Sequence, residues 1–299
     1  MTLAEAARVL REGGVAAFPT ETVYGLGANA LDAKAVARIY ELKGRPSTSP
    51  LIVHVASVEM ARALVRTWPE AAERLAAKWW PGPLTLVLPK RARVPDVVTA
   101  GLDTAGIRMP AHPVALALLK EAGVPLAAPS ANRFTQLSPT SAEHVKAAFG
   151  EAVPVLDGGP CEVGIESTVV SLAGERPVLL RPGMVSREEL EEILGPIEDA
   201  APAEGAHESP GLHERHYQPR TPLFVALTPP AEGKGRYLRV EDLSREPAGY
   251  ARRLYAELHR LDTEGLDWIA VEPPPEGPAW EGIRDRLRRA GRYNMGERR

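Results

Sequence analysis

Apolar residues in the first 195 positions alternate between short continuous runs and longer stretches with helical spacing. Short runs bounded by Gly, Pro or polar residues are typical of buried strands, whereas apolar residues three or four positions apart indicate amphipathic helices. The runs predict strands at 15–18, 51–55, 84–88, 106–108, 125–128, 153–156, 168–172 and 178–180. The helical spacing predicts helices at 3–12, 32–43, 57–66, 70–79, 113–122, 140–149 and 186–194. This alternation predicts an α/β domain, and the closely spaced runs at 168–172 and 178–180 favour a hairpin within a mixed sheet.

The pattern breaks between residues 195 and 222, where Pro, Gly, Ala, Glu and His follow one another without periodicity. A loop of this length inside a compact domain is uncommon unless it is functional or separates two domains. Beyond it, a smaller α/β unit is predicted by apolar runs at 223–227 and 267–271 and by helical patterns at 246–263 and 280–290. We therefore expect a first domain at 1–195, a linker at 196–222 and a second domain at 223–299.

Composition narrows the function classes. The chain has 299 residues, of which 44% are apolar, and this is enough for two hydrophobic cores. A formal net charge of -3 argues against a polyanion-binding surface over the whole protein. The single cysteine, Cys161, excludes a disulfide framework and a cysteine-built zinc site. No apolar run approaches the roughly 20 residues of a membrane helix, so we expect a cytoplasmic protein without a membrane partner.

Residues 17–27 combine a predicted strand end, two threonine hydroxyls and two glycines, which allow close approach of the backbone to a ligand. The next predicted helix ends between Lys43 and Arg45. Cations are favoured at a helix C-terminus, so a solvated helix end is one interpretation of this pair. The hydroxyls of residues 47–49, held between two prolines, favour the other interpretation. Cations beside preorganised hydroxyl and N–H groups form a site for phosphate.

Polar side chains recur at the ends of other predicted strands, at His54, Arg108, Ser130, Ser167 and Arg181, and Ser138 opens a predicted helix. A lone strand histidine is more often a core residue, and a strand-end arginine can make an ordinary surface ion pair. The planar fork of Arg108 also suits a substrate carboxylate, however, and hydroxyls near a helix N-terminus can meet an anion.

The chain contains no GxSxG, Walker A or HExxH motif. Instead it offers hydroxyl, guanidinium and ammonium groups, which can align two substrates and neutralise phosphate charge without a covalent enzyme intermediate. This set of groups favours nucleotidyl transfer.

Nine sequence blocks, in order, carry a resemblance to a known family: 19–27, 43–46, 49–54, 80–85, 108–110, 128–132, 138–140, 164–169 and 180–183. Together they resemble the YrdC family, and residues 209–219 resemble the linker motif of its long two-domain branch, the threonylcarbamoyl-AMP synthases. The resemblance implies a YrdC-like twisted mixed sheet with flanking helices as the catalytic domain, followed by a smaller Rossmann-like α/β domain.

The resemblance also implies a reaction. L-Threonine, bicarbonate and ATP would give L-threonylcarbamoyl-adenylate and pyrophosphate, for modification of the adenosine next to the anticodon in tRNA. The threonine amine would capture bicarbonate, and the carbamate oxygen would attack the α-phosphorus of ATP. Both reactants are anionic, so Mg²⁺ is expected with the ATP phosphates, without zinc or an organic cofactor. A tRNA or a tRNA threonylcarbamoyltransferase complex is the expected downstream partner.

The matched blocks assign expected roles to individual residues. The threonine-side positions are Thr22, His54, Arg108, Ala128 and Ser167, with Arg108 as the partner of the substrate carboxylate. The ATP-side positions are Lys43, Arg45, Ser49, Thr104, Ser130, Ser138, Arg181 and Tyr217, with Lys43 and Arg45 as catalytic residues. Tyr217 lies in the linker, which we expect to fold over the nucleotide as a lid and to exclude water from the mixed anhydride.

The chain departs from the family pattern at Phe134 and Thr135, where Ser-Gly is usual, and its second domain is shorter than expected. Two other functions stay open at this point. Related domains occur in hydrogenase-maturation carbamoyltransferases, although one cysteine cannot supply the zinc regions of those proteins. A double-stranded RNA-binding module is the other alternative, against which the acidic net charge argues.

Overall fold

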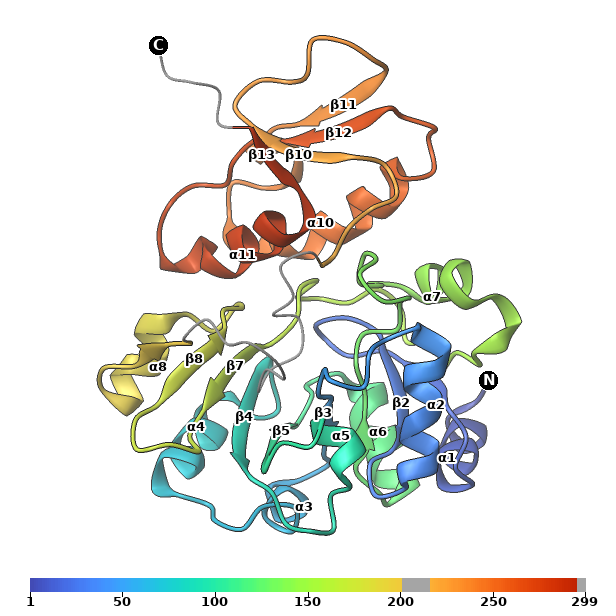
Figure 1. Ribbon diagram of the computed structural model, residues 1–299, viewed down its shortest axis with the longest axis vertical. Helices are drawn as coiled ribbons and strands as arrows, with labels where there is room; N and C mark the ends of the chain where they lie inside the picture. The colour runs from blue at the N-terminus through green and yellow to red at the C-terminus, as the bar shows by residue number, and fades with distance from the viewer. Residues whose placement is uncertain (201–215, 295–299) are drawn as a thin grey trace.

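The structure, a computed structural model, describes residues 1–200 and 216–294. It contains a larger first domain and a smaller second domain (Figure 1). Residues 209–215 of the expected linker motif lie outside the described residues, whereas residues 216–219 lie within them.

A nine-stranded sheet in the order β1-β2-β6-β3-β5-β4-β7-β8-β9 forms the centre of the first domain. Its strands are β1 (Ala16–Phe18), β2 (Gly25–Asn29), β3 (Ile52–His54), β4 (Leu84–Pro89), β5 (Thr104–Arg108), β6 (Leu126–Ala127), β7 (Thr168–Ser171), β8 (Val178–Arg181) and β9 (Glu198–Asp199). β3 pairs with β5 in parallel, whereas β7 and β8 pair antiparallel. The predicted mixed sheet and its hairpin are therefore confirmed.

The helices of this domain are α1 (Leu3–Arg11), α2 (Ala33–Lys43), α3 (Val58–Arg62), α4 (Glu70–Trp79), α5 (Asp96–Thr99), α6 (Pro113–Ala122), α7 (Ala142–Phe149) and α8 (Arg187–Leu194), with a 3₁₀ turn at Gly150–Ala152. Local sequence explains the ends of α2. The Asp32 carboxylate accepts from two backbone N–H groups at its start, and Gly44 adopts φ 61° at its end. Lys43 and Arg45 therefore flank a helix end, as predicted.

Two strand predictions differ from the structure. β2 was not predicted, because its Gly-rich sequence has low strand propensity; it forms by pairing antiparallel with both β1 and β6. Gly27 is required there, since an added Cβ would lie 2.6 Å from the Phe18 ring. The predicted strand at 153–156 is wrong. It makes only an isolated bridge between Val155 and Ala17, and Pro154 has no N–H for a longer ladder.

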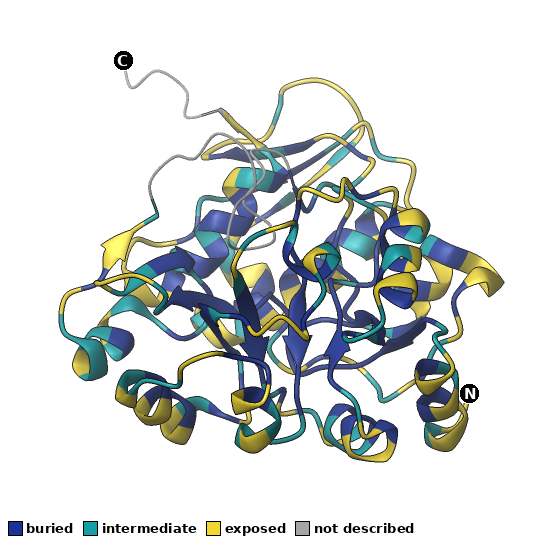
Figure 2. Cartoon of the chain, turned by 60° about the horizontal axis from the view of Figure 1, so that its bottom comes forward, coloured by how far each residue is buried: buried dark blue, intermediate teal, exposed yellow. Residues whose placement is uncertain are grey.

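The two faces of the sheet carry separate apolar clusters. Val53, Leu86 and Val170 face the main cluster, together with Val36 of α2 and Leu75 of α4. The opposite face carries a cluster between α1, α6 and β1 at one end. Towards the other end of that face, β3, β4, β7 and β8 contribute only a small cluster. Figure 2 shows the strands largely buried, with exposure concentrated on the outer sides of helices and on loops.

The second domain has a four-stranded parallel sheet in the order β11-β12-β10-β13. Its elements are β10 (Leu223–Ala226), β11 (Gly235–Leu238), α9 (Val240–Leu243), α10 (Pro247–Leu261), β12 (Trp268–Val271), a 3₁₀ turn (Pro278–Trp280), α11 (Glu281–Ala290) and β13 (Arg292–Asn294). This parallel α/β arrangement agrees with the expected fold class. β11 and β13 were not predicted; both are short strands with exposed residues.

Helices α10 and α11 lie between the second sheet and the first domain (Figure 1). Val23, Leu137 and Ile165 of the first domain belong to the same buried cluster as residues of these helices. The backbones also approach closely: an added Cβ on Gly282 of α11 would lie 2.7 Å from the Gly183 oxygen. The two domains thus share a packed interface.

The first sheet extends past residue 195, the end predicted for the first domain, because β9 pairs in parallel with β8. Within residues 1–200 and 216–294, no helix has the length and apolar character needed to cross a bilayer.

Candidate active site

Side chains from separate parts of the chain line one cavity. Its walls are formed by Thr20, Thr22, Val23, Gly25, Arg45, Ile52, His54, Arg108, Ala128, Pro129, Ser130, Glu166, Ser167, Arg181, His216 and Tyr217. All five predicted threonine-side residues belong to this lining, and so do Arg45, Ser130, Arg181 and Tyr217 of the predicted ATP side. The structure therefore brings most of the predicted site residues together.

Arg108 is buried at the end of β5 and makes three hydrogen bonds. It donates to the Gly82 carbonyl (3.1 Å), to Thr22 Oγ1 (2.9 Å) and to Glu21 Oε1 (2.6 Å). Glu21 also accepts from the Ala111 N–H at 3.0 Å. Because a guanidinium has five N–H donors, these contacts hold Arg108 in place and leave donors for a carboxylate.

His54 lies at the end of β3 with its ring edge-on to Phe18. Its Nδ1 is buried without a hydrogen-bond partner. Burial, and secondarily the charge of Arg108, lower the pKa of His54 to about 3. The imidazole is therefore neutral near pH 7, and His54 is a polar wall residue rather than a cation.

Arg45 reaches the cavity from just beyond the end of α2. It donates to Ser49 Oγ and to the Pro50 carbonyl, and its Nε is buried without a partner. Phe134 lies against the guanidinium, 5.9 Å from its carbon to the ring centre. Burial lowers the pKa of Arg45 to about 10, so this side chain stays a cation at neutral pH.

Lys43 lies behind the cavity wall. Its ammonium donates to the carbonyls of Ser130 (2.6 Å) and Asn132 (2.5 Å), within the loop that follows β6. Burial, followed by the charge of Arg45, lowers the pKa of Lys43 well below its ordinary value. In this arrangement Lys43 supports the loop that carries Ser130 and does not itself line the cavity.

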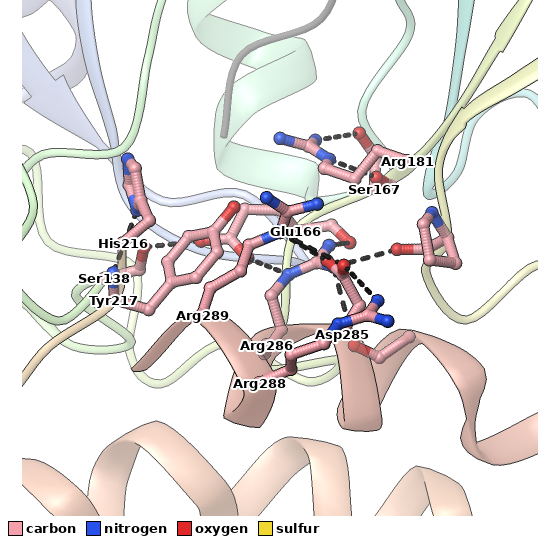
Figure 3. Close-up of polar contacts among 12 residues, drawn as sticks. Ser138, Glu166, Ser167, Arg181, His216, Tyr217, Asp285, Arg286, Arg288 and Arg289 are labelled. Carbon is pink, nitrogen blue, oxygen red and sulfur yellow. Dashed lines mark hydrogen bonds and ion pairs between the residues drawn. The ribbon is translucent and has the colours of Figure 1, made fainter. Parts of the chain in front are cut away.

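Ser167 and Arg181 form a connected pair on neighbouring strands. Arg181 donates to the Ser167 carbonyl at 3.0 Å and to its Oγ at 3.2 Å (Figure 3). Thr85 of β4 lies 2.8 Å from the same Oγ. The pairing of β7 with β8 thus places one hydroxyl and one guanidinium side by side.

Tyr217 closes the cavity from the segment that follows the undescribed residues. It is 1% exposed, adopts φ 62°, and its hydroxyl is buried without a hydrogen-bond partner. Its ring lies 4.1 Å from the ring of His216 and 5.9 Å from that of Tyr255. The expected path of the linker back over the site agrees with this position.

Four predicted ATP-side residues do not line the cavity: Lys43, described above, and Ser49, Thr104 and Ser138. Ser49 and Ser138 lie one contact away, bonded to Arg45 and to Glu166 respectively. Thr104 begins β5, whereas Arg108 ends it, and four strand residues span about 13 Å. The structure therefore places Thr104 at the opposite end of its strand from Arg108, and its contact with the nucleotide stays a prediction.

Phe134 and Thr135, the departure from the family pattern, follow a defined path. The Phe134 N–H donates to the Lys43 carbonyl at 2.9 Å, and the Thr135 carbonyl accepts from the Gln218 N–H at 2.8 Å. Thr135 adopts φ 67°. This loop therefore connects the end of α2 to the Tyr217 segment.

The prediction missed Glu21, Glu166, His216 and Arg286. Glu21 and Glu166 lie in the sequence blocks 19–27 and 164–169, next to Thr22 and Ser167. Their positions in the sequence could therefore have indicated that they lie near the site. Burial alone would raise the pKa of Glu166, but the charges of Arg286 and Arg181 outweigh it and lower that pKa. Arg286 lies in another domain, and sequence spacing offers no signal for its contact with Glu166.

Among residues 1–200 and 216–294, no three His, Cys, Asp or Glu side chains are arranged to hold a metal ion. Glu166 of the cavity lining already binds Arg286, and Glu21, behind the lining, already binds Arg108. These residues fit Mg²⁺ only as an ion that arrives on the ATP phosphates.

Comparison with known proteins assigns the family. Residues 8–183 match the family described as "Telomere recombination", and residues 185–291 match "Threonylcarbamoyl-AMP synthase, C-terminal domain". A threonylcarbamoyl-AMP synthase of Pyrococcus abyssi is 44% identical over 97% of this chain and 94% of that protein. This chain belongs to the threonylcarbamoyl-AMP synthase family. It has the two-domain form, since both domains match.

Two further comparisons agree. A threonylcarbamoyl-AMP synthase of Bacillus subtilis is 42% identical over 96% of this chain and 92% of that protein. The crystal structure of P. abyssi Sua5 complexed with L-threonine superposes with a TM-score of 0.93 at 41% identity, covering 99% of this chain and 96% of that one. This membership replaces the carbamoyltransferase alternative, and the nucleotidyltransferase class expected from the sequence is confirmed.

Proposed function

We propose that the cavity is the active site in which this protein forms L-threonylcarbamoyl-adenylate and pyrophosphate from L-threonine, bicarbonate and ATP. The observation that carries the proposal is the convergence of Arg45, Arg108 and Arg181 on one cavity. Three buried cations around a shared space suit two anionic reactants that must meet.

The threonine side lies around Arg108. Its remaining N–H donors bind the substrate carboxylate, and the contacts with Glu21 and Thr22 fix its orientation. Ala128 and neutral His54 border the same part of the cavity. With the carboxylate held, the amino group is positioned for capture of bicarbonate.

The ATP side lies around Arg45 and Arg181, with Ser130 between β6 and α7. The guanidinium groups neutralise phosphate charge while the carbamate oxygen attacks the α-phosphorus and pyrophosphate leaves. Mg²⁺ bound to the phosphates would supply further charge neutralisation. No side chain needs to form a covalent bond, because alignment and electrostatic stabilisation lower the barrier.

Access for the nucleotide requires movement of the cavity wall. The cavity has a volume of about 50 Å³, whereas pockets for drug-sized ligands have volumes of roughly 300–1,000 Å³. Tyr217 lies in the cavity wall, and moving it breaks no hydrogen bond of its hydroxyl to a residue that the structure describes. We propose that Tyr217 moves aside for ATP and then covers it, excluding water from the mixed anhydride.

The product is an activated threonylcarbamoyl group, so the step that follows is transfer to tRNA. We place the reaction in the cytoplasm, with a tRNA or a tRNA threonylcarbamoyltransferase complex as the receiving partner. Direct tRNA binding would be detected by a steep loss of affinity between about 50 and 200 mM salt.

Pyrophosphate release tests the function directly. The full chain should release pyrophosphate from ATP only when both threonine and bicarbonate are present. Arg45→Ala should lower this rate by roughly 10²- to 10³-fold, as for the loss of one charge-stabilising donor. Lys43→Ala should have a similar effect through the loop that it supports. Release independent of threonine, or unchanged rates in both variants, would contradict the proposal.

A further inference from the structure

Helix α11 of the second domain places one guanidinium against the wall of the cavity. Arg286 is completely buried. It donates from Nε to Glu166 Oε2 at 2.8 Å, from Nη2 to the Glu166 carbonyl at 3.1 Å and from Nη1 to the Pro182 carbonyl at 2.9 Å (Figure 3). One side chain thus binds two segments of the first domain, directly before Ser167 and directly after Arg181.

The helix itself holds Arg286 in this position. Asp285, 1% exposed, accepts from Arg286 Nη1 at 2.9 Å, and it also binds Arg288 and Arg289 at 3.0 Å. The Arg286 guanidinium carbon lies 5.4 Å from the centre of the Tyr217 ring. Arg286 is therefore fixed between its own helix, the cavity wall and the Tyr217 segment.

The Arg286 guanidinium compensates the charge of Glu166. Glu166 lines the cavity, accepts a short hydrogen bond from Ser138, and accepts from the Tyr255 hydroxyl at 3.3 Å. A carboxylate in the wall of a site for a polyanionic nucleotide repels the phosphates unless a nearby cation compensates it. Arg286 forms an ion pair with it.

We infer that Arg286 is a positioning residue for ATP: it neutralises Glu166 and fixes the backbone on either side, so that Ser167 and Arg181 face the nucleotide. The second domain thereby completes the ATP side of a site whose lining otherwise comes from the first domain and the Tyr217 segment. This inference rests on the proposed ATP side of the cavity.

Steady-state kinetics of Arg286→Gln tests the inference. Two unit charges separated by about 8 Å, at an effective dielectric constant of about 20, change binding roughly 30-fold, and this sets the scale expected for an uncompensated Glu166. The KM for ATP should rise by about that factor, whereas the KM for threonine should stay within about two-fold. Arg286→Lys, which keeps the charge, should recover part of the loss. The matched control is Arg288→Gln, because Arg288 also binds Asp285 but is exposed and makes no contact with Glu166.

The double variant Glu166→Gln/Arg286→Gln separates charge from structure. Removing the carboxylate as well should return the KM for ATP to within about three-fold of the native value. Glu166→Gln alone should not raise the KM for ATP. This single variant can still contradict the inference if Arg286→Gln fails to fold. A KM for ATP that rises with Glu166→Gln alone, or stays high in the double variant, would overturn the inference.

A separate variant distinguishes this inference from the proposed function. Arg181→Gln should raise the KM for ATP, because Arg181 touches the nucleotide in the proposed arrangement. If Arg181→Gln raises it and Arg286→Gln does not, the inference alone is wrong. If neither variant changes it, the ATP side of the cavity is wrong, and the inference falls with it.

Discussion

Gly282 offers a test of the domain interface through a single methyl group. It lies four residues before Arg286, one turn earlier on α11. An added Cβ would lie 2.7–2.8 Å from the oxygen, carbonyl carbon and Cα of Gly183. These are backbone atoms of the segment that follows Arg181, so they cannot move aside as a flexible side chain would. Gly282→Ala should therefore push α11 away from the first domain.

The expected size of the effect follows from two opposing contributions. Replacing glycine by alanine stabilises a helix interior by about 0.8–1 kcal/mol, and this is an upper limit for Gly282, the second residue of α11. Overpacking a tight contact costs roughly 1–3 kcal/mol. The net expectation is a loss of up to about 2–3 kcal/mol at the interface. A coupling change of about 1 kcal/mol corresponds to roughly a five-fold change in affinity, so the KM for ATP should rise by several-fold.

The assay is pyrophosphate release at varied ATP, together with the thermal unfolding midpoint. Gly174→Ala is the matched control, since the nearest atom to its added Cβ is the Arg176 carbonyl oxygen at 3.8 Å. That variant should behave as the native protein does. An unchanged KM for ATP and an unchanged midpoint in Gly282→Ala would contradict this expectation. They would show that α11 and the Gly183 segment leave room for an added methyl group.

Three other results are expected. Arg108→Gln should raise the KM for threonine by about 10- to 100-fold, as for the loss of a charged hydrogen bond. An equal rise in the KM for ATP would contradict the assignment of Arg108 to the threonine carboxylate. Burial lowers the pKa of His54 to about 3 and that of His259 to about 4, so the unfolded chain binds more protons below pH 6.5. The free energy of unfolding should therefore fall with acidification between about pH 6.5 and 4, by up to about 1.4 kcal/mol per pH unit for each histidine. His259→Gln should reduce this dependence of the unfolding free energy on pH. The same pH dependence in His259→Gln and in the native protein would contradict the effect of burial on His259. A fragment ending at Ala200 should stay folded, because the three apolar clusters on the first sheet consist of residues within 1–200. It should release pyrophosphate more slowly than the full chain. Full activity of this fragment would show that the second domain does not contribute to the active site.

Local patterns predicted the longer helices, because their signals are short-range, but they missed the short helices α5 and α9 and extended α3 beyond Arg62. Asp32 and Gly44 mark the two ends of α2 in the sequence itself, and their backbone conformations agree. β2 escaped prediction because a Gly-rich segment becomes a strand only when partners exist on both sides. The close approach of Gly27 to Phe18 shows why glycine occupies that strand.

The site was predictable to the extent that strand ends point to one edge of a sheet. This reasoning placed Arg108 and Arg181 correctly beside the cavity. It could not predict where Thr104 lies relative to the cavity, because Thr104 begins the strand that Arg108 ends. The contact between Arg286 and Glu166 depends on how the two domains dock, and no local pattern in the sequence encodes that arrangement.

A crystal structure of the full chain with L-threonine and a non-hydrolysable ATP analogue would test whether both substrates share one cavity. The account predicts the threonine carboxylate at Arg108 and the phosphates between Arg45 and Arg181, with the amino group facing the α-phosphate across one continuous cavity. Electron density for the two ligands in separate cavities, or phosphates at the opposite end of β5 near Thr104, would contradict this arrangement.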